Sequence, residues 1–208
     1  MQRVNRPFLF AITGGIASGK TLFAEMLRES GFTIYDTDVI AHQMIEKARV
    51  LLVQRWGTGI LDGQGINRGE VARIVFESEN ERLFLNSILH PMILEEMQSI
   101  IEHTDEEHIG FEIPLLFETG LQDCFDLSIL VTATYDTRIE RLIDRGMDSN
   151  EAKRRISSQM TEEKKGKMAD IIVNNDHDII SLKKEALNIG NVIRQSRKKE
   201  TIAGFISL

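Results

Sequence analysis

The sequence predicts an α/β fold in which a five-stranded parallel sheet is flanked by helices. Two observations lead to this prediction: short apolar runs alternate with stretches of helical periodicity, and a glycine-rich loop joins the first run to the first helix. Strands buried on both faces of a parallel sheet are expected to be apolar throughout. Such runs occur at residues 8–12, 32–35, 109–113, 127–132 and 171–173.

Helices are predicted between and after these runs. Their ranges are 21–28, 37–48, 80–103, 134–145, 149–160 and 181–194. Gly31 suits the position just after the first helix, whereas Pro91 should interrupt the third. Asp148, followed three residues later by Glu151, resembles the capping pair of a helix start. Residues 48–104 have an all-helical pattern and are too long for one connection between strands, so we interpret them as a helical insertion.

The composition narrows the class of partner and compartment. The net charge of −7, from 25 basic and 32 acidic residues, argues against nucleic acid or an anionic membrane as the main partner. No segment approaches the length needed to span a bilayer. The single cysteine, Cys124, excludes an intrachain disulfide, which is typical of a reducing compartment. We therefore expect a cytoplasmic protein, and its oligomeric state stays open.

The glycine-rich loop carries the strongest functional signal. Residues 14–21 read GGIASGKT, a complete phosphate-binding loop (P-loop) of the form G-x-x-x-x-G-K-[ST]. In this pattern backbone N–H groups surround an anion, the lysine reaches the β- and γ-phosphates, and the final hydroxyl holds Mg²⁺. The helix that follows adds the positive end of its dipole. The predicted nucleotide-binding residues here are Gly14, Gly15, Ile16, Ala17, Ser18, Gly19, Lys20, Thr21 and Leu22.

The P-loop alone does not distinguish a kinase from a GTPase or a motor-type ATPase. The guanine-reading motif of GTPases, N/T-K-x-D, is absent from the sequence. A large ATPase would usually need a longer chain than 208 residues. Phosphoryl transfer to a small molecule therefore fits best.

Carboxylates follow two of the predicted strands. Asp36 and Asp38 come directly after the second run, and Glu112 lies near the end of the third. The carboxyl ends of parallel strands face the ligand crevice, so an aspartate there can accept the proton of an attacking hydroxyl or orient Mg²⁺. We favour Asp38, although Asp36 or Thr37 can instead cap the next helix. Glu112 either holds Mg²⁺ through water or pairs with Lys20 or an arginine.

Three arginines share one face of the predicted helix 134–145. Arg138, Arg141 and Arg145 are spaced by three and four residues, and residues 137–167 carry a net charge of +3, from nine basic and six acidic residues. Arginine binds phosphate in a bidentate manner, so this face can close over a transferring phosphoryl group. Arg145 is the first candidate. The alternative is a solvated face paired with neighbouring acids.

Taken together, these residues resemble the dephospho-CoA kinase family over nearly the whole chain. Each similar element is weak alone, but their order is specific. The elements are residues 12–21, Asp36-Thr-Asp38, Trp56-Gly, Asp62-Gly, Asn67-Arg68, Ile74-Val-Phe76, Leu89-His-Pro91, Pro114-Leu-Leu-Phe-Glu118, Arg155-Ile156, Gln159, Ala169-Asp170 and Asn175.

The resemblance implies ATP- and Mg²⁺-dependent phosphorylation of the ribose 3′-hydroxyl of dephospho-CoA, the last step of coenzyme A synthesis. It implies a single kinase domain with a nucleotide-binding core (7–47, 105–133 and 168–196), a coenzyme-binding insertion (48–104) and a lid (134–167). The implied catalytic residues are Asp38 as the base, Lys20, and Arg145 as the lid arginine. Asn175 falls in the adenine-binding stretch, and the implied substrate-binding residues are Thr13, Asp38, Arg68, His90, Leu115 and Arg141.

The chain also departs from the family pattern. Ala17 replaces a usual glycine of the loop, which should matter little if its φ is negative. Thr37 replaces a common alanine, and the stretch 174–177 ends on His177 without the usual glycine. Two alternatives to the implied function remain: another nucleoside or nucleotide kinase, and a nucleotide-dependent regulatory switch.

Overall fold

The computed structural model of the chain describes residues 6–199. The strands are β1 (Phe8–Thr13), β2 (Thr33–Asp36), β3 (Leu61–Asp62), β4 (Gly65–Ile66), β5 (His108–Glu112), β6 (Leu127–Thr132) and β7 (Ile171–Asn174). The α-helices are α1 (Lys20–Glu29), α2 (Thr37–Lys47), α3 (Arg49–Trp56), α4 (Arg68–Glu77), α5 (Glu79–Glu102), α6 (Tyr135–Asp144), α7 (Ser149–Ser157), α8 (Glu162–Met168) and α9 (Ile179–Gln195). Two 3-10 helices, η1 (Thr58–Ile60) and η2 (Leu121–Cys124), complete the set.

The five predicted strands form one sheet, which confirms the fold class. Their order is β2-β5-β1-β6-β7, and all four pairings are parallel. The chain order reverses at β1, whose neighbours β5 and β6 both come later in the sequence. Ligands of open α/β sheets bind at such a reversal, beyond the carboxyl ends of the strands. The P-loop follows β1 and therefore occupies this position.

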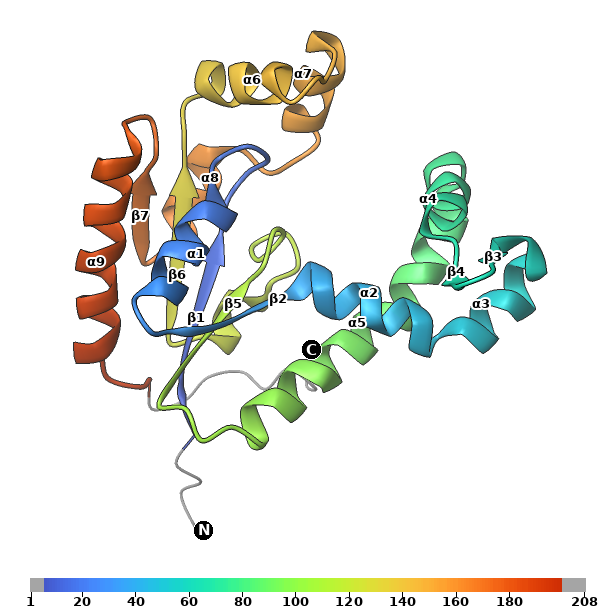
Figure 1. Cartoon of the computed structure of the whole chain (residues 1–208), viewed down its shortest axis with the longest axis horizontal. Helices are drawn as coiled ribbons and strands as arrows, with labels where there is room; N and C mark the ends of the chain where they lie inside the picture. The colour runs from blue at the N-terminus through green and yellow to red at the C-terminus, as the bar shows by residue number, and fades with distance from the viewer. Residues whose placement is uncertain (1–5, 200–208) are drawn as a thin grey trace. The chain divides into compact units, whose positions relative to one another are not determined.

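Packing explains why these strands are apolar. All six residues of β1 are buried, as expected of a central strand covered on both faces. One face is covered by α1 and α9, and a cluster of buried side chains joins Phe10 of β1, Phe23 and Leu27 of α1, and Leu182 and Ile189 of α9. Figure 1 shows α6 and α7 beyond the carboxyl end of β6, at the end of the sheet that carries the P-loop. The sheet thus holds the loop on rigid elements.

The chain divides into two compact units, and the division differs from the expected boundary. The sheet and its helices form one unit, and the second unit begins at Thr37 and ends at His103. The family resemblance implies that residues 37–47 belong to the nucleotide-binding core. They form α2, whose Glu46 accepts a hydrogen bond from Ile66 N at 2.8 Å and whose Lys47 lies 2.8 Å from Glu96. These contacts tie α2 to the second unit.

The second unit is not all-helical, contrary to our prediction. Its β3 and β4 form an antiparallel pair. The turn between them is closed by Asp62, whose carboxylate accepts hydrogen bonds from Gln64 N and Gly65 N at 2.8 and 3.0 Å. Aspartate stabilises turns through such local bonds to the backbone. Strands of two residues leave too short a pattern for periodicity to detect.

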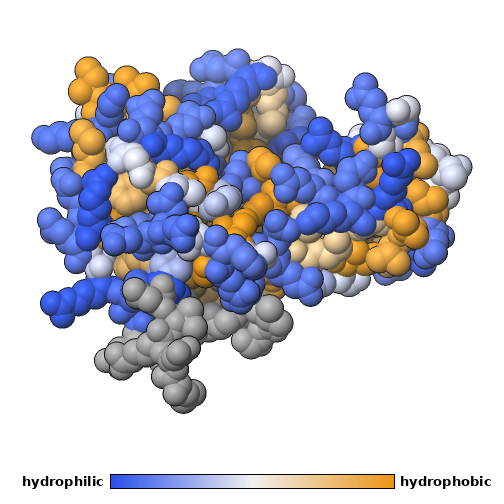
Figure 2. All heavy atoms as spheres, turned by 60° about the horizontal axis from the view of Figure 1, so that its bottom comes forward, coloured by the Kyte–Doolittle hydropathy of each residue, from blue (hydrophilic) through white to orange (hydrophobic). Residues whose placement is uncertain are grey.

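Two helices also differ from expectation. The long helix α5 continues through Pro91, because buried apolar residues on both sides of the proline, among them Leu85, Leu89, Leu94 and Met97, hold it in place. The helix α8 was not predicted. It begins at the cap residue Thr161, whose side chain accepts a hydrogen bond from Lys164 N. Among residues 6–199, no helix has the length and apolar character that a membrane span requires. Figure 2 shows one face of the molecule, on which hydrophilic side chains predominate.

One buried carboxylate links distant parts of the first unit and should make its stability depend on pH. Asp126 accepts hydrogen bonds from both terminal nitrogens of Arg6, at 2.5 and 2.7 Å. It also accepts from Leu9 N at 2.9 Å and Lys199 N at 2.6 Å. Burial raises the pKa of this carboxyl, but these bonds and the charge of Arg6 more than offset that effect, so the pKa lies below its ordinary value.

Because the folded state lowers this pKa, the stabilising contribution is complete above the unfolded value, about 3.9. It is lost as the pH falls through the folded value. We expect the free energy of unfolding in urea to decline from about pH 5 downward, and Asp126→Asn to reduce that slope. The exposed neighbour Asp123 provides the control variant Asp123→Asn. Equal slopes in wild type and Asp126→Asn would contradict the expectation.

Candidate active site

The P-loop passes from β1 into α1 with its glycines in tight surroundings. A Cβ atom on Gly14 would lie 2.4 Å from the carbonyl oxygen of Val131, so the loop passes directly against the backbone of β6. Gly19 caps α1 with a positive φ of 92°, which glycine adopts at little cost. The loop therefore presents its N–H groups and the start of α1 on one side, as an anion site requires.

Lys20 and Thr21 converge on one buried carboxylate. Glu112 is 1% exposed, and its Oε1 accepts hydrogen bonds from Lys20 Nζ at 2.5 Å and Thr21 Oγ1 at 2.6 Å. Arg28 lies 3.7 Å from Oε2. Burial raises the pKa of Glu112. The hydrogen bonds from Lys20 and Thr21 and the charges of Lys20 and Arg28 lower it by more, so the pKa lies below its ordinary value. Of the alternatives for Glu112, the structure shows the pair with Lys20 and, at a longer distance, Arg28.

The donor set at this point suits Mg²⁺. Magnesium binds hard oxygen ligands and usually takes one or two carboxylates together with substrate phosphates and water. The Thr21 hydroxyl and the Glu112 carboxylate are such donors, 2.6 Å apart. In the described part of the chain no group of three or more His, Cys, Asp or Glu side chains has a metal-binding arrangement. Nucleotide phosphates and water are the other ligands that Mg²⁺ usually takes in such sites.

The three arginines of α6 and its C-cap differ in their contacts. Arg138, 4% exposed, donates from Nε to Ile16 O at 2.8 Å, and Arg141 donates to Ala17 O and Asn175 O at 3.2 and 2.7 Å. Both side chains bind the backbone of or beside the P-loop. Arg145, our first candidate, is exposed at the C-cap of α6. Its side chain makes no hydrogen bond or ion pair with a described residue.

The expectation for Ala17 was wrong in its premise. Its φ is 61°, and it is the one non-glycine residue of the described chain with positive φ. The left-handed region costs a residue with a Cβ roughly 1–2 kcal/mol. The methyl group is buried in an apolar cluster with Leu142, Ala152 and Ile156. This packing of the loop against α6 and α7 partly offsets the strain.

Asn175 contacts the P-loop directly. It is 5% exposed, its Nδ2 donates to Ser18 O at 2.8 Å, and a Cβ on Gly19 would lie 2.0 Å from this nitrogen. The predicted nucleotide-binding residue is thus placed against the loop backbone.

We expect Gly19→Ala to destabilise the protein by more than about 2 kcal/mol, because it adds left-handed strain and displaces the buried amide of Asn175. Gly146→Ala is the matched control, since Gly146 also has positive φ, 85°, but no atom within 4 Å of the added Cβ. Urea unfolding of both variants measures the difference. Equal losses would show that the Asn175 contact contributes nothing.

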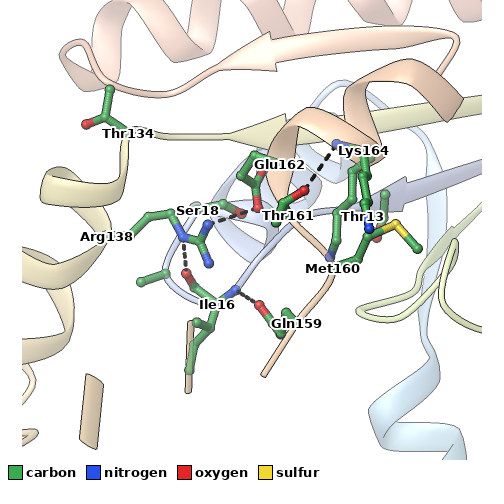
Figure 3. Close-up of polar contacts among 12 residues, drawn as sticks. Thr13, Ile16, Ser18, Thr134, Arg138, Gln159, Met160, Thr161, Glu162 and Lys164 are labelled. Atoms are coloured by element: carbon green, nitrogen blue, oxygen red, sulfur yellow. Dashed lines mark hydrogen bonds and ion pairs between the residues drawn. The ribbon is translucent and has the colours of Figure 1, made fainter. Parts of the chain in front are cut away.

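A cleft of about 610 Å³ lies at the same end of the sheet. Its lining includes Thr132, Thr134, Tyr135, Arg138, Gln159 and Glu162. Glu162 lies 2.9 Å from Arg138, and Gln159 Oε1 accepts a hydrogen bond from Ile16 N at 2.8 Å, as Figure 3 shows. The volume is within the range of small-molecule sites, about 300–1,000 Å³.

The contacts described above do not include the other predicted residues. Thr13 is fully buried, with its hydroxyl 3.4 Å from Pro114 O, and Leu115 is 44% exposed in the turn after β5. Asp38, Arg68 and His90 belong to the second unit and are all exposed. Asp38 is in the first turn of α2, two residues after the end of β2.

Several residues that contact the P-loop or its partners were not predicted from the sequence. Glu162 and Arg28 gave no signal in the sequence, because their spacing to the P-loop has no local pattern. Gln159 and Glu118 were named only as parts of the family resemblance, without a role. A side chain that acts on the loop from far along the chain is recognised only when both are placed.

Comparison with known proteins identifies the family. A sequence model described as dephospho-CoA kinase matches residues 8–181. The chain belongs to the dephospho-CoA kinase family. A dephospho-CoA kinase of Bacillus cereus is 38% identical over 183 residues, covering 84% of this chain and 92% of that protein. One of Fusobacterium nucleatum is 35% identical over 181 residues, covering 85% and 94%. The solved dephospho-CoA kinase from Campylobacter jejuni has a TM-score of 0.70 at 26% identity, covering 89% of this chain and 96% of that one. The predicted family and enzyme class are confirmed.

Proposed function

We propose that this protein transfers the γ-phosphoryl group of ATP to the ribose 3′-hydroxyl of dephospho-CoA, giving coenzyme A and ADP. The observation that carries the proposal is the complete P-loop at the reversal of a parallel sheet, with Lys20 and Thr21 meeting on Glu112, in a chain of this family. Phosphoryl transfer depends mainly on positioning and on stabilising charge.

The donor half of the reaction uses residues of the first unit. The loop N–H groups and the start of α1 bind the phosphates. The Lys20 ammonium, which pairs with Glu112 here, can turn to the β- and γ-phosphates and offset the charge that develops on the transferring group. Thr21 and Glu112 would hold Mg²⁺, which when bound neutralises phosphate charge. Arg145, exposed beside Gly146, remains our candidate for a lid arginine that reaches the phosphoryl group.

The acceptor half uses Asp38. An exposed carboxylate in the first turn of α2 can accept the proton of the ribose hydroxyl as the oxygen attacks phosphorus. Arg68, His90 and Leu115, all exposed, are the proposed contacts of the acceptor, and Arg141 and Thr13 are proposed to support the phosphates through the loop they contact. Asn175 supports the adenine end.

We further propose a cytoplasmic enzyme that binds these two small molecules and no nucleic acid. Its one thiol, Cys124, is buried and free, and burial raises its pKa to about 11. Such a thiol is unreactive, and a free cysteine is typical of a reducing compartment.

ADP release, measured with ATP and Mg²⁺ in the presence and absence of dephospho-CoA, tests the proposal. We expect release to require dephospho-CoA and mass spectrometry to identify coenzyme A as the product. Release that requires a nucleoside instead would favour another small-molecule kinase. Slow release that ignores both acceptors would favour a nucleotide-dependent switch.

A further inference from the structure

The backbone of Ile16 is held on both sides by residues from outside the P-loop. Ile16 N donates to Gln159 Oε1 at 2.8 Å, and Ile16 O accepts from Arg138 Nε at 2.8 Å. Figure 3 shows the two side chains reaching this residue from different segments. Arg138 is on α6, and Gln159 lies in the short connection between α7 and α8. Arg138 and Gln159, from two different segments, thus bind the backbone of the same loop residue.

These two hydrogen bonds lie beside the strained part of the loop. The next residue, Ala17, has a φ of 61°, and a strained backbone persists only where surrounding contacts determine it. If the hydrogen bonds to Ile16 are lost, we expect part of the population to relax to other loop conformations. The apparent affinity for a nucleotide then falls by the fraction of molecules that keep the binding-competent loop.

The position of Gln159 depends in turn on Glu118. The residue after Gln159 is Met160, whose backbone N donates to Glu118 Oε1 at 3.2 Å. The same oxygen lies 3.0 Å from Lys165 Nζ. The Lys165 side chain is 0% exposed, and a buried ammonium needs a counter-charge. Glu118 is therefore held between the connection that carries Gln159 and the helix α8.

Glu118 lies far from the P-loop in sequence. It follows β5 in the same segment as Leu115, and this segment begins with Pro114, whose carbonyl oxygen lies 3.4 Å from Thr13 Oγ1. We propose that Glu118 is a positioning residue for the nucleotide-binding loop and that it acts through Gln159. Leu115, in the same segment, is a proposed contact of the acceptor, so this segment would connect the acceptor site with the nucleotide-binding loop. That connection rests on the proposed function, whereas the positioning of the loop does not.

The competing explanation is that Glu118 only stabilises α8 by neutralising Lys165. The two explanations differ in a double-mutant cycle, because a residue that acts through another has no effect once the other is removed. Glu118→Ala alone would leave the buried Lys165 without a counter-charge and threaten folding. Every variant of the cycle therefore carries Lys165→Met, which removes the ammonium and keeps an apolar side chain of similar length.

The test measures ADP binding by titration calorimetry for Lys165→Met alone and with Glu118→Ala, with Gln159→Ala, and with both. ADP needs no acceptor, so a failure of the proposed function does not affect the reading. We expect each added substitution to weaken ADP binding about three- to tenfold, the value of one hydrogen bond. We expect the variant with both to bind no more than about twofold more weakly than the one with Gln159→Ala.

The control is Glu163→Ala, which removes an exposed carboxylate of α8 that pairs with Lys167 and should leave the affinity unchanged. The proposal is overturned if Glu118→Ala leaves ADP binding unchanged, or if its effect persists in full without Gln159. Failure of the Lys165→Met protein to bind ADP, with wild type binding it, would also overturn it, because the background would then hold no competent loop. Phosphorylation of dephospho-CoA by the wild type is measured separately and tests only the proposed function.

Discussion

Lys20→Met is expected to reduce turnover with ATP and dephospho-CoA at least about a hundredfold. The ammonium of Lys20 is the charge that the P-loop aims at the β- and γ-phosphates. Methionine keeps the aliphatic length of the side chain and removes that charge. The measurement is kcat in a coupled assay of ADP release, at saturating concentrations of both substrates.

Two comparisons separate catalysis from folding in this experiment. Lys20 pairs with the buried Glu112, and removing one partner of a buried pair destabilises a protein. A second variant that combines Lys20→Met with Glu112→Gln removes both charges and should unfold closer to wild type in urea. Lys184→Met, on the exposed side of α9, is the control for loss of a lysine. A folded Lys20→Met enzyme with turnover within tenfold of wild type would remove Lys20 from the mechanism.

Asp38→Asn is the second change with a large expected effect, a loss of at least about a hundredfold in turnover. Asparagine has nearly the same shape as aspartate but is a far weaker base, so the acceptor hydroxyl loses its proton acceptor. Affinity for ADP should stay within about twofold, because Asp38 belongs to the acceptor half of the proposed site. Steady-state kinetics and titration calorimetry measure the two quantities.

The first turn of α6 offers a matched control for this variant. Asp136 is exposed there, as Asp38 is in the first turn of α2, so both replacements remove the same favourable interaction with a helix dipole. Asp136→Asn should leave turnover unchanged. Asp36→Asn, measured in parallel, identifies which of the two aspartates after β2 acts as the base. Wild-type turnover in Asp38→Asn would assign the role elsewhere.

Much of the fold could be predicted because its main signals are local. The central strand β1 is covered on both faces, with all six of its residues buried, so its whole run is apolar. The hairpin β3–β4 and the helix α8 were not predicted. The two strands have two residues each, and the helix has seven residues and is rich in charge, so neither shows a detectable hydrophobic periodicity. The grouping of α2 with the second unit depends on contacts of Glu46 and Lys47 with residues further along the chain, which no local pattern shows.

The sequence by itself determined the strands, the P-loop and the family. The strands and the P-loop depend on residues close together in the chain, and the family depends on the order of short motifs along it. Only the tertiary structure decided how the loop is held. Ala17 adopts a positive φ because Arg138, Arg141 and Gln159, more than a hundred residues later, bind the backbone beside it. These contacts to the loop come from Arg138, Arg141 and Gln159, and not from Arg145. Contacts over such distances have no spacing rule in the sequence, because the fold alone brings their partners within hydrogen-bond reach.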